Sequence, residues 1–388
     1  MKIIIFVILL VIELSGFPAW IPQKANTETG GYLKDLPYLV FDNENTDFNN
    51  LIHFRTDFRW YPWSFLTLEI GGRLQLYTGD TFGSNGSLDT LADIYSTDVG
   101  YADLTDAWSS LLYANIDRAW LGLEYNNLNL MLGRQRINWG TNLVWNPNDW
   151  YNAFNFIDFD YEERPGTDAF HIQYYTSAVS VAELALEAGK DQQDRTFAVM
   201  YKFNTGGYDL QFQGGLYGLD GALGFSWSGG IAGGGFRGEV AYFHPFFDEG
   251  VNNFVADDSS GNFVAALSAD YTFPNSIYIH GEFLYNGFGT NGKIDSAQIF
   301  APVSAKNLLP SAFGIFVELG YTFSPLVYGT FSLSTNPADF SLYLAPSVNW
   351  SVFQNIDLFM IGQIFFGGSN TLYGDTGDLL AFRVKWSF

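Results

Sequence analysis

The chain has 388 residues, no Cys and a formal net charge of −23. The lack of Cys excludes a disulfide framework and a thiolate metal site. The excess of acid argues against nucleic acid as a partner, because phosphate binding needs clustered Lys and Arg. Aromatic residues reach 18%, whereas charged residues are only 15% and mean hydropathy is +0.03. This balance is unusual for a soluble globule and favours a transmembrane β-barrel, which needs aromatic girdles and apolar side chains on only half of its strand positions.

The first residues have the organisation of a secretory signal peptide. A cation at Lys2 precedes the apolar run Ile3–Ile12, which is too short to span a membrane as a helix. We therefore predict a signal peptide over residues 1–25, with the cleavage site left open. No later stretch approaches eighteen uninterrupted apolar residues, so membrane insertion is expected to use strands.

Period-two alternation, the mark of a strand with one apolar face, recurs along the chain. It predicts strands in at least five internal segments, whose apolar members are Leu66, Leu68, Ile70, Leu74 and Leu76; Phe197, Val199, Tyr201 and Phe203; Leu210, Phe212 and Leu216; Phe263, Ala265, Leu267, Ala269 and Tyr271; and Phe313, Ile315, Val317 and Leu319. A soluble sandwich would alternate in the same way, so this pattern alone does not decide what solvent each face meets.

The C-terminal segment alternates most clearly, and the chain stops on an aromatic residue. Phe382, Val384, Trp386 and Phe388 are separated by polar Arg383, Lys385 and Ser387. A final amphipathic strand of this kind resembles the sorting signal read by the machinery that inserts barrels into the bacterial outer membrane. An edge strand of a soluble sheet is the alternative interpretation.

The spacing of turns supports a membrane barrel. Short turn-like pieces are expected at 61–63, 126–127, 204–206, 274–275, 324–325 and 354–355, and longer loops at 79–107, 244–261 and 287–311. Short turns at one end and long loops at the other are typical of a transmembrane barrel. With residues 31–41 as the first strand, the pattern predicts a single up-and-down antiparallel barrel of about 18 strands over residues 26–388, or 16 if two weak segments are loops.

The residues expected to face the lumen carry both signs of charge. The basic ones are Arg55, Arg59, Arg73, Lys202, Arg237, Arg383 and Lys385, and the acidic ones are Asp57, Glu69, Glu183, Glu187, Asp209, Glu239, Glu282 and Glu318. Much of the net negative charge falls in loops, at Asp42, Glu44, Asp47, Asp257, Asp258, Asp375, Asp378 and between Asp89 and Asp106. These loops could bind divalent cations near lipopolysaccharide, since hard cations prefer oxygen ligands, or could simply be solvated.

One segment breaks the alternation. Residues 138–167 are dense in polar and aromatic residues, with turn signals at Asn146-Pro147 and Pro165-Gly166. Its three Trp argue against disorder, because such side chains need to be buried. We predict that this loop folds into the lumen and constricts it; the alternative is a network that only pins the loop to the wall. The candidate residues are Arg134, Arg136, Trp139, Asn146, Asp149, Glu162, Glu163, Arg164 and Asp168.

A resemblance becomes specific around this segment. The pieces Gly133-Arg-Gln-Arg-Ile-Asn-Trp-Gly140, Trp145-Asn-Pro-Asn-Asp149 and Glu162-Glu-Arg-Pro-Gly-Thr-Asp168 resemble an uncharacterised family of bacterial outer-membrane barrels. The Gly-Arg-Gln and Trp-Gly pieces are also similar to alginate-export-type and porin-like barrels. The resemblance covers residues 117–175 and implies an outer-membrane location and transport of a solute. Because the expected lumen is mixed in charge, a polyanionic solute is disfavoured.

No catalytic centre, metal site or cofactor is expected. His53, His171 and His280 could face the lumen but show no metal-ligand spacing, and no Ser lies in a nucleophile motif. Three functional classes remain: a porin-like channel or transporter for a polar solute, a non-conducting structural or adhesive surface barrel, and a barrel-embedded hydrolase. The first is favoured, because about 18 strands enclose a lumen too wide for side chains alone to fill. Expected partners are outer-membrane lipid, lipopolysaccharide and the insertion machinery.

Overall fold

The protein was analysed as a computed structural model, which describes residues 26–42, 45–80, 102–106, 110–160, 164, 166–246 and 261–388. The predicted signal peptide, residues 89–101 of the acidic stretch between Asp89 and Asp106, and Glu44, Glu162, Glu163, Asp257 and Asp258 lie outside these ranges. Within them, no helix has the length and apolar character needed to cross a membrane.

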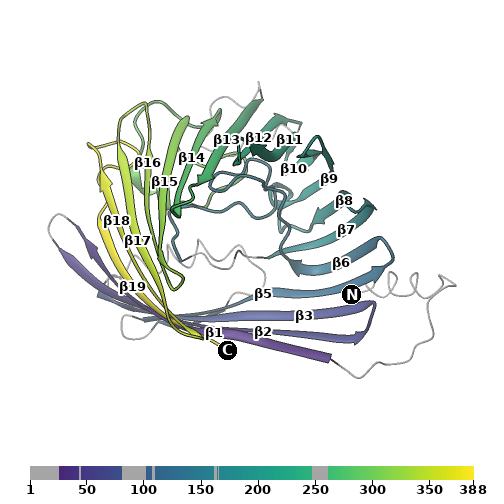
Figure 1. The fold of residues 1–388 in the computed structure, drawn as a ribbon, viewed down its shortest axis with the longest axis horizontal. Coiled ribbons are helices and arrows are strands. Elements are labelled where there is room, and N and C mark those ends of the chain that lie inside the picture. Colours follow the sequence, from purple (N-terminus) through teal and green to yellow (C-terminus); the bar gives the residue numbers. More distant parts are fainter. Residues whose placement is uncertain are drawn as a thin grey trace.

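The described residues form nineteen strands in one antiparallel sheet (Figure 1). They are β1 (Asn26–Phe41), β2 (Thr46–Trp63), β3 (Leu66–Gly79), β4 (Ala102–Asp106), β5 (Ser110–Tyr125), β6 (Leu128–Gln135), β7 (Thr167–Ser177), β8 (Ser180–Glu187), β9 (Thr196–Thr205), β10 (Tyr208–Tyr217), β11 (Asp220–Ile231), β12 (Gly234–Pro245), β13 (Asn262–Thr272), β14 (Ile277–Asn286), β15 (Phe313–Ser324), β16 (Val327–Thr335), β17 (Leu342–Phe353), β18 (Ile356–Phe366) and β19 (Asp378–Ser387).

Eighteen of these strands close into a barrel. Each pairs with its sequence neighbour, β3 pairs directly with β5, and β1 pairs with β19, so that the first and last strands complete the ring. The short β4 pairs only with β5 and lies beside the ring. The predicted 18-stranded barrel is therefore confirmed, and the 16-strand alternative is wrong.

Two predicted boundaries need correction. The first strand begins at Asn26 rather than Gly31, because its early residues pair with Asp57–Tyr61 of β2 beyond the point where β19 ends. The turn expected at 61–63 lies inside β2, which continues across a register shift to Trp63 before the chain turns at 64–65.

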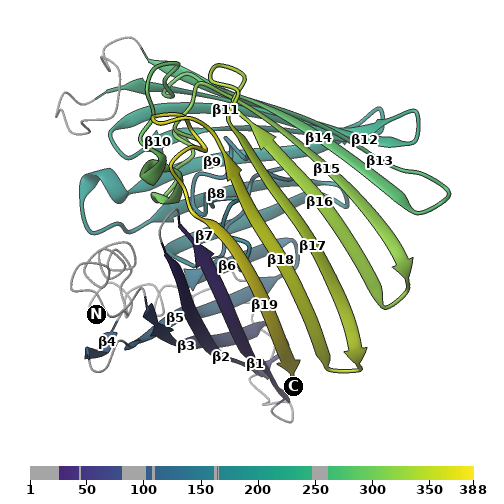
Figure 2. The ribbon, with the colours of Figure 1, turned by 90° about the vertical axis from the view of Figure 1, so that its left-hand side faces the viewer.

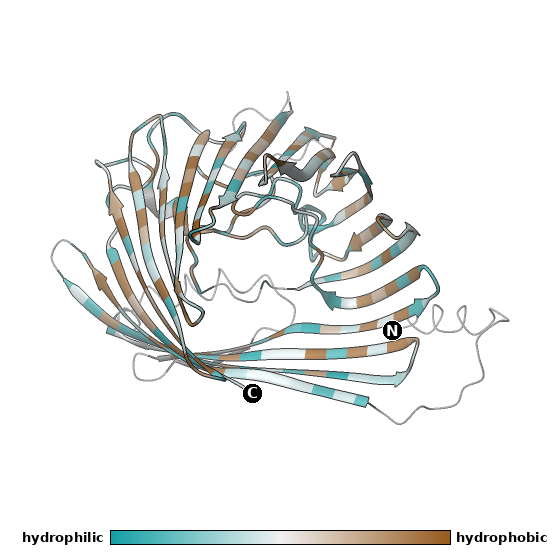
Figure 3. Ribbon diagram, viewed as in Figure 1, coloured by the Kyte–Doolittle hydropathy of each residue, from teal (hydrophilic) through white to brown (hydrophobic). Residues whose placement is uncertain are grey.

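The alternation predicted from sequence fixes the two faces of the wall, as the colour bands along the strands in Figure 3 show. On β9, Phe197, Val199 and Tyr201 are exposed on the outside, whereas Ala198 and Met200 are buried within the barrel. The expected sorting-signal residues Phe382, Trp386 and Phe388 are likewise exposed on the outer face. A wide apolar outer face with a polar inner face suits a wall that lipid surrounds.

The two ends of the barrel differ (Figure 2). The beginning of β1, the end of β19 and the short turns lie at the same end of the barrel. There Gly31 and Phe388 exchange two backbone hydrogen bonds of 3.1 and 3.0 Å. At the other end are the longer connections, including 136–166, 287–312 and 367–377, although 42–45 and 218–219 at this end are short. In barrels of this class the long loops are extracellular.

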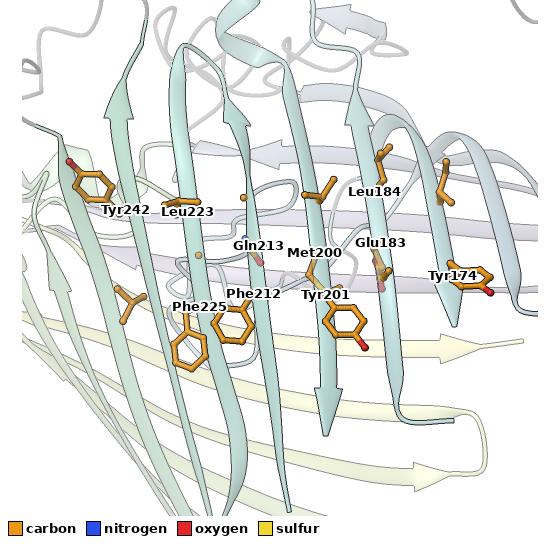
Figure 4. Close-up of a pocket in the computed structure, with 16 residues that line it drawn as sticks. Tyr174, Glu183, Leu184, Met200, Tyr201, Phe212, Gln213, Leu223, Phe225 and Tyr242 are labelled. Carbon is orange, nitrogen blue, oxygen red and sulfur yellow. The ribbon is translucent and has the colours of Figure 1, made fainter. Parts of the chain in front are cut away.

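The outer face also carries apolar depressions. One lies across β7–β12, lined by Tyr174, Leu184, Tyr201, Phe212, Leu223 and Tyr242, with Gly214 and Gly224 in its floor (Figure 4). Its lining is almost wholly apolar, so it is a feature of the surface that meets lipid and not a solute site.

Removing Phe388 tests the closure of the barrel. Each of the two lost backbone hydrogen bonds contributes about 1 kcal/mol, and the Phe388 ring also stacks on Phe54 at 6.2 Å between centroids. We expect a chain truncated before Phe388 to yield less folded barrel in membranes. The folded fraction is measured as the protein whose electrophoretic mobility changes on heating. Phe353→Ala, an exposed aromatic at the same end that takes no part in closure, is the control. Equal yields from both variants would contradict this role.

Candidate functional site: a loop anchored inside the barrel

The segment between β6 and β7 lies inside the ring of strands (Figure 1). It spans 136–166, since Arg134 and Gln135 still pair with β7 and Thr167 already belongs to that strand, so the predicted limits of 138–167 shift slightly. Its described residues, 136–160, 164 and 166, have no regular secondary structure. Their backbone N–H and C=O groups therefore need partners from elsewhere, because a buried unpaired group costs free energy.

Two carboxylates of the inner wall accept hydrogen bonds from five of the backbone N–H groups of the loop. Glu239 on β12 accepts hydrogen bonds from the backbone N–H of Thr141, of Asn142 at 2.7 Å and of Asn148 at 2.9 Å. Glu282 on β14 accepts from the N–H of Val144 at 3.1 Å and of Trp145 at 2.6 Å. Hydrogen bonds to a charged acceptor are the stronger kind. The two carboxylates thus hold residues 141–148 against the wall.

Neutral side chains complete this attachment. Gln211 on β10 donates to the carbonyl of Trp139 at 2.8 Å, and Gln213 donates to that of Asn148 at 3.0 Å. Ser268 on β13 donates to the Asn142 side chain at 2.9 Å. Side chains of β10, β12, β13 and β14 therefore offer donors and acceptors that match the path of the loop.

The loop also brings an aromatic core into the lumen. Trp145 packs edge-on against Phe316 of β15, and Trp150 lies against Phe243 of β12, with ring centroids 6.3 and 6.1 Å apart. Trp139 donates its indole N–H to Glu183 of β8 at 2.8 Å. The inner wall of β8, β9, β11 and β12 contributes small residues to the same hydrophobic cluster as these rings: Ala185, Ala198, Ala222 and Ala241. The three Trp side chains of the loop, which were predicted to need burial, are buried by this packing.

The second half of the loop crosses to the other side of the barrel. Gln363 on β18 donates to the carbonyl of Ile157 at 2.7 Å. Asp160 then forms ion pairs with Lys34 of β1 at 2.6 Å and with Arg383 of β19 at 3.4 Å. Contacts of one loop thus extend from β8 through β14 and β18 to β1.

The return of the loop is fixed by a buried ion pair. Arg164 contacts Asp149 at 3.0 Å, and Arg118 of β5 donates to the Arg164 carbonyl at 2.9 Å. Asp149 has no exposed surface, and this burial raises the pKa of its carboxyl to about 6, against the opposing effects of Arg164 and Arg136. The pair joins the two halves of the loop.

A second connection covers the extracellular end of this loop. In the segment 287–312, Ile299 accepts a hydrogen bond from the Asn155 side chain, and Lys306 pairs with Asp220 of β11 at 2.6 Å. Ile294 of the same segment donates to the carbonyl of Asn370 in the segment 367–377. These contacts join three extracellular connections into one packed unit.

The predicted site residues fall into three groups. Trp139, Asn146 and Asp149 are buried in the loop, and Arg164 is brought to Asp149. Arg134 and Asp168 instead form an ion pair of 2.7 Å between neighbouring wall strands, which closes the base of the loop. Arg136 is exposed where the loop begins.

Sequence reasoning missed the anchors. Glu239 and Glu282 were expected only as lumen charges, and nothing in their local sequence indicates that loop backbone would approach them. Asp160 lies within the segment that was singled out, but its partner Lys34 carried no signal. The three inner-wall His are buried on separate strands: His171 contacts Glu183 at 2.8 Å and His280 contacts Glu282 at 3.4 Å, whereas His53 packs on Tyr32. Over the described part of the chain, no group of three or more His, Asp or Glu could hold a metal ion.

Comparison with solved structures finds this fold in outer-membrane proteins. The crystal structures of Acinetobacter baumannii OccAB4 and OccAB1 each superpose with a TM-score of 0.61 at 11% identity, covering 95% and 97% of this chain and 98% and 99% of theirs. The outer membrane protein opdK from Pseudomonas aeruginosa superposes with a TM-score of 0.56 at 9% identity, covering 94% of this chain and 98% of that one. This chain shares their fold. Closed barrels of this kind lie in the bacterial outer membrane.

No family model matches the chain, and no curated protein matches it in sequence. The resemblance to an uncharacterised barrel family around residues 117–175 therefore stays a prediction.

Glu239→Ala should release the first half of the loop. At least three N–H groups lose their acceptor, and each buried N–H left unpaired costs about 1–3 kcal/mol. We expect amide hydrogen exchange across residues 137–152 to speed up by at least about tenfold, the factor that corresponds to 1.4 kcal/mol, with the strands still protected.

Glu318→Ala is the matched control for this measurement, because Glu318 is an inner-wall carboxylate that accepts from Ser332 rather than from the loop. Equal exchange in the two variants would mean that the carboxylate does not anchor the loop.

Proposed function

We propose that the protein is a porin-like channel that passes a polar solute across the outer membrane, with the 136–166 loop as its constriction. The observation that carries this proposal is a charged inner wall on β2, β3 and β5 in a barrel whose loop is fixed mainly elsewhere. The first half of the loop is fixed to β8–β14, and its second half reaches β18 through Ile157 and β1 and β19 through Asp160. A plug that served only to fill the barrel would not need a wall kept polar opposite it.

The wall facing the loop is lined by charged side chains on adjacent strands. Arg55 of β2 pairs with Asp117 of β5 at 2.5 Å and with Asp57 at 2.8 Å, and Arg73 of β3 also pairs with Asp117. Lys385 of β19 lies over the Tyr32 ring. Asp57 and Arg73 remain partly exposed at this surface, and a lining with charges of both signs suits a path for a small polar solute, as charged linings do in other pores.

The likeness to solved outer-membrane barrels supports the fold of a channel and leaves the solute open. A non-conducting adhesive barrel and a barrel-embedded hydrolase are the competing functions. Glu239 and Glu282 contact loop backbone and Asp117 contacts two Arg, an arrangement that anchors the loop and pairs charges, and this favours transport over hydrolysis.

The first experiment is single-channel recording of the refolded protein in a planar bilayer. We expect discrete conductance steps, which deletion of residues 142–163 should enlarge, because the deletion removes the segments that narrow the lumen. Folding of the deletion variant is checked by heat-modifiable mobility. A folded wild-type barrel without steps would contradict the channel, and an unchanged step size after the deletion would contradict the constriction.

Asp160→Asn should alter ion selectivity. The substitution removes the negative partner of Lys34 and Arg383, so the passage gains positive potential and the reversal potential in a salt gradient should move toward that of chloride. Asp209→Asn is the control, since Asp209 lies at the short-turn end beside Asn204. A shift of the same size in both variants would show that Asp160 has no special place in the passage.

A further inference from the structure

The apolar belt on the outer face of the barrel differs in height around the ring. Along β15 every outward side chain is apolar, from Phe323 beside the short turn to Phe313 at the other end of the strand. At about 3.3 Å per residue and a tilt of about 40°, these residues cover about 25 Å along the membrane normal. This matches the apolar band of an outer-membrane barrel, so lipid can cover the wall here without deforming.

The belt is much lower over β6, β7 and β8. Counted from the short turn, the outward apolar residues of β6 are Leu128, Leu130 and Leu132, which cover about 10 Å by the same measure. The next outward residue is Arg134, which pairs at 2.7 Å with Asp168, its neighbour on β7. The Asp168 side chain is 35% exposed. A charged pair therefore stands at a height where a full belt would meet lipid chains.

Lipid alone covers such a face poorly. Charged side chains on the outer face are unfavourable against hydrocarbon, and a short belt forces the bilayer to thin at a cost that rises with the mismatch. Association with another protein is the other way to cover a short belt. The low wall also adjoins the hollow across β7–β12 (Figure 4), where Phe212 and Leu223 are 51% and 66% exposed. This face thus offers a partner a surface into which side chains can pack.

The charges at the crest of this face suit a second copy of the same chain. The whole chain has a net charge of −23, so two copies repel each other on average. The connection 188–195 between β8 and β9 instead carries two basic and two acidic residues, all exposed: Lys190, Arg195, Asp191 and Asp194. Together with the Arg134–Asp168 pair, it forms a crest without net charge. Two copies can meet at this crest without net repulsion.

The face is large enough for a stable contact. Adjacent strands are about 4.8 Å apart, or about 6 Å around the ring at this tilt, so β6 to β12 span about 37 Å. These strands average about ten residues, or about 25 Å in height. The resulting area of about 900 Å² exceeds the area of about 800 Å² per partner that a standard protein interface buries.

We propose that the outer face of β6–β12 is an interface for a second copy of this chain, so that the protein is an oligomer in the membrane. Within a surface that otherwise meets lipid, the second copy covers the Arg134–Asp168 pair and fills the hollow across β7–β12. Lipid covers the full belt of β15 and its neighbours. This assembly does not depend on whether the barrel conducts.

The chain has no Cys, so single nitroxide labels can report contact between copies. One label is attached to Leu223→Cys at the hollow, and a control label to Met360→Cys, 49% exposed on the outer face of β18. Dipolar coupling between labels is measured for each variant in phosphatidylcholine vesicles. We expect coupling at position 223 to be severalfold stronger than at position 360. Two results would overturn the proposal: no coupling at either position, which means a monomer in a thinned bilayer, and equal coupling at both, which means contact through no particular face.

Filling the hollow gives an independent measurement. Gly214 faces outward in this hollow, where an added side chain first approaches the flexible end of Leu223. Gly214→Phe should lower the mass of the assembly in mild detergent, measured by light scattering. Gly329→Phe, in a separate outer hollow across β14–β19, is the matched control and should leave that mass unchanged. Heat-modifiable mobility shows that both variants are folded. The same mass for both variants would also overturn the proposal.

Discussion

The closure of the sheet is the constraint on which the rest of this structure depends. A membrane offers no water to backbone N–H and C=O groups, so a sheet that crosses it can have no free edge. Here the pairing of β1 with β19 removes that edge, and the two backbone hydrogen bonds between Gly31 and Phe388 complete the pairing. The outer face must then be apolar along every strand, and polar side chains are left to the inside.

Closure with eighteen strands creates a second requirement, because the lumen is wider than wall side chains can fill. The chain meets it by sending 136–166 inward with its own aromatic core. The described residues of this segment have no regular structure, and five of its backbone N–H groups would be unpaired inside the barrel without Glu239 and Glu282. The inner wall is therefore built around the loop, with carboxylates where loop N–H groups arrive and small Ala residues where loop rings pack.

Charged side chains inside the barrel are likewise paired with partners on other segments. Asp117 is fully buried and forms ion pairs with Arg55 and Arg73. Asp149 pairs with Arg164, and Asp160 pairs with two cations of the wall. Removing one member of such a buried pair is costly, because it leaves the other charge uncompensated. The pairs of Asp117 join strands of the wall, that of Asp149 joins the two halves of the loop, and those of Asp160 tie the loop to the wall. Together they set the electrostatic character of the passage that we propose. The sequence predicted inner-wall charges of both signs, and this pairing is the reason that both signs are present.

The sequence by itself determined the architecture. Alternation along the strands, the aromatic last residue and the contrast between short turns and long loops led to an eighteen-stranded barrel, because those features follow from the period of a strand and the two solvents it meets. The break in alternation over residues 138–167 located the inward segment for the same reason. Only the tertiary structure decided what holds that segment. Glu239 lies almost a hundred residues from Thr141 and Lys34 more than a hundred from Asp160, and such partnerships depend on the register around the whole ring, which no local pattern encodes.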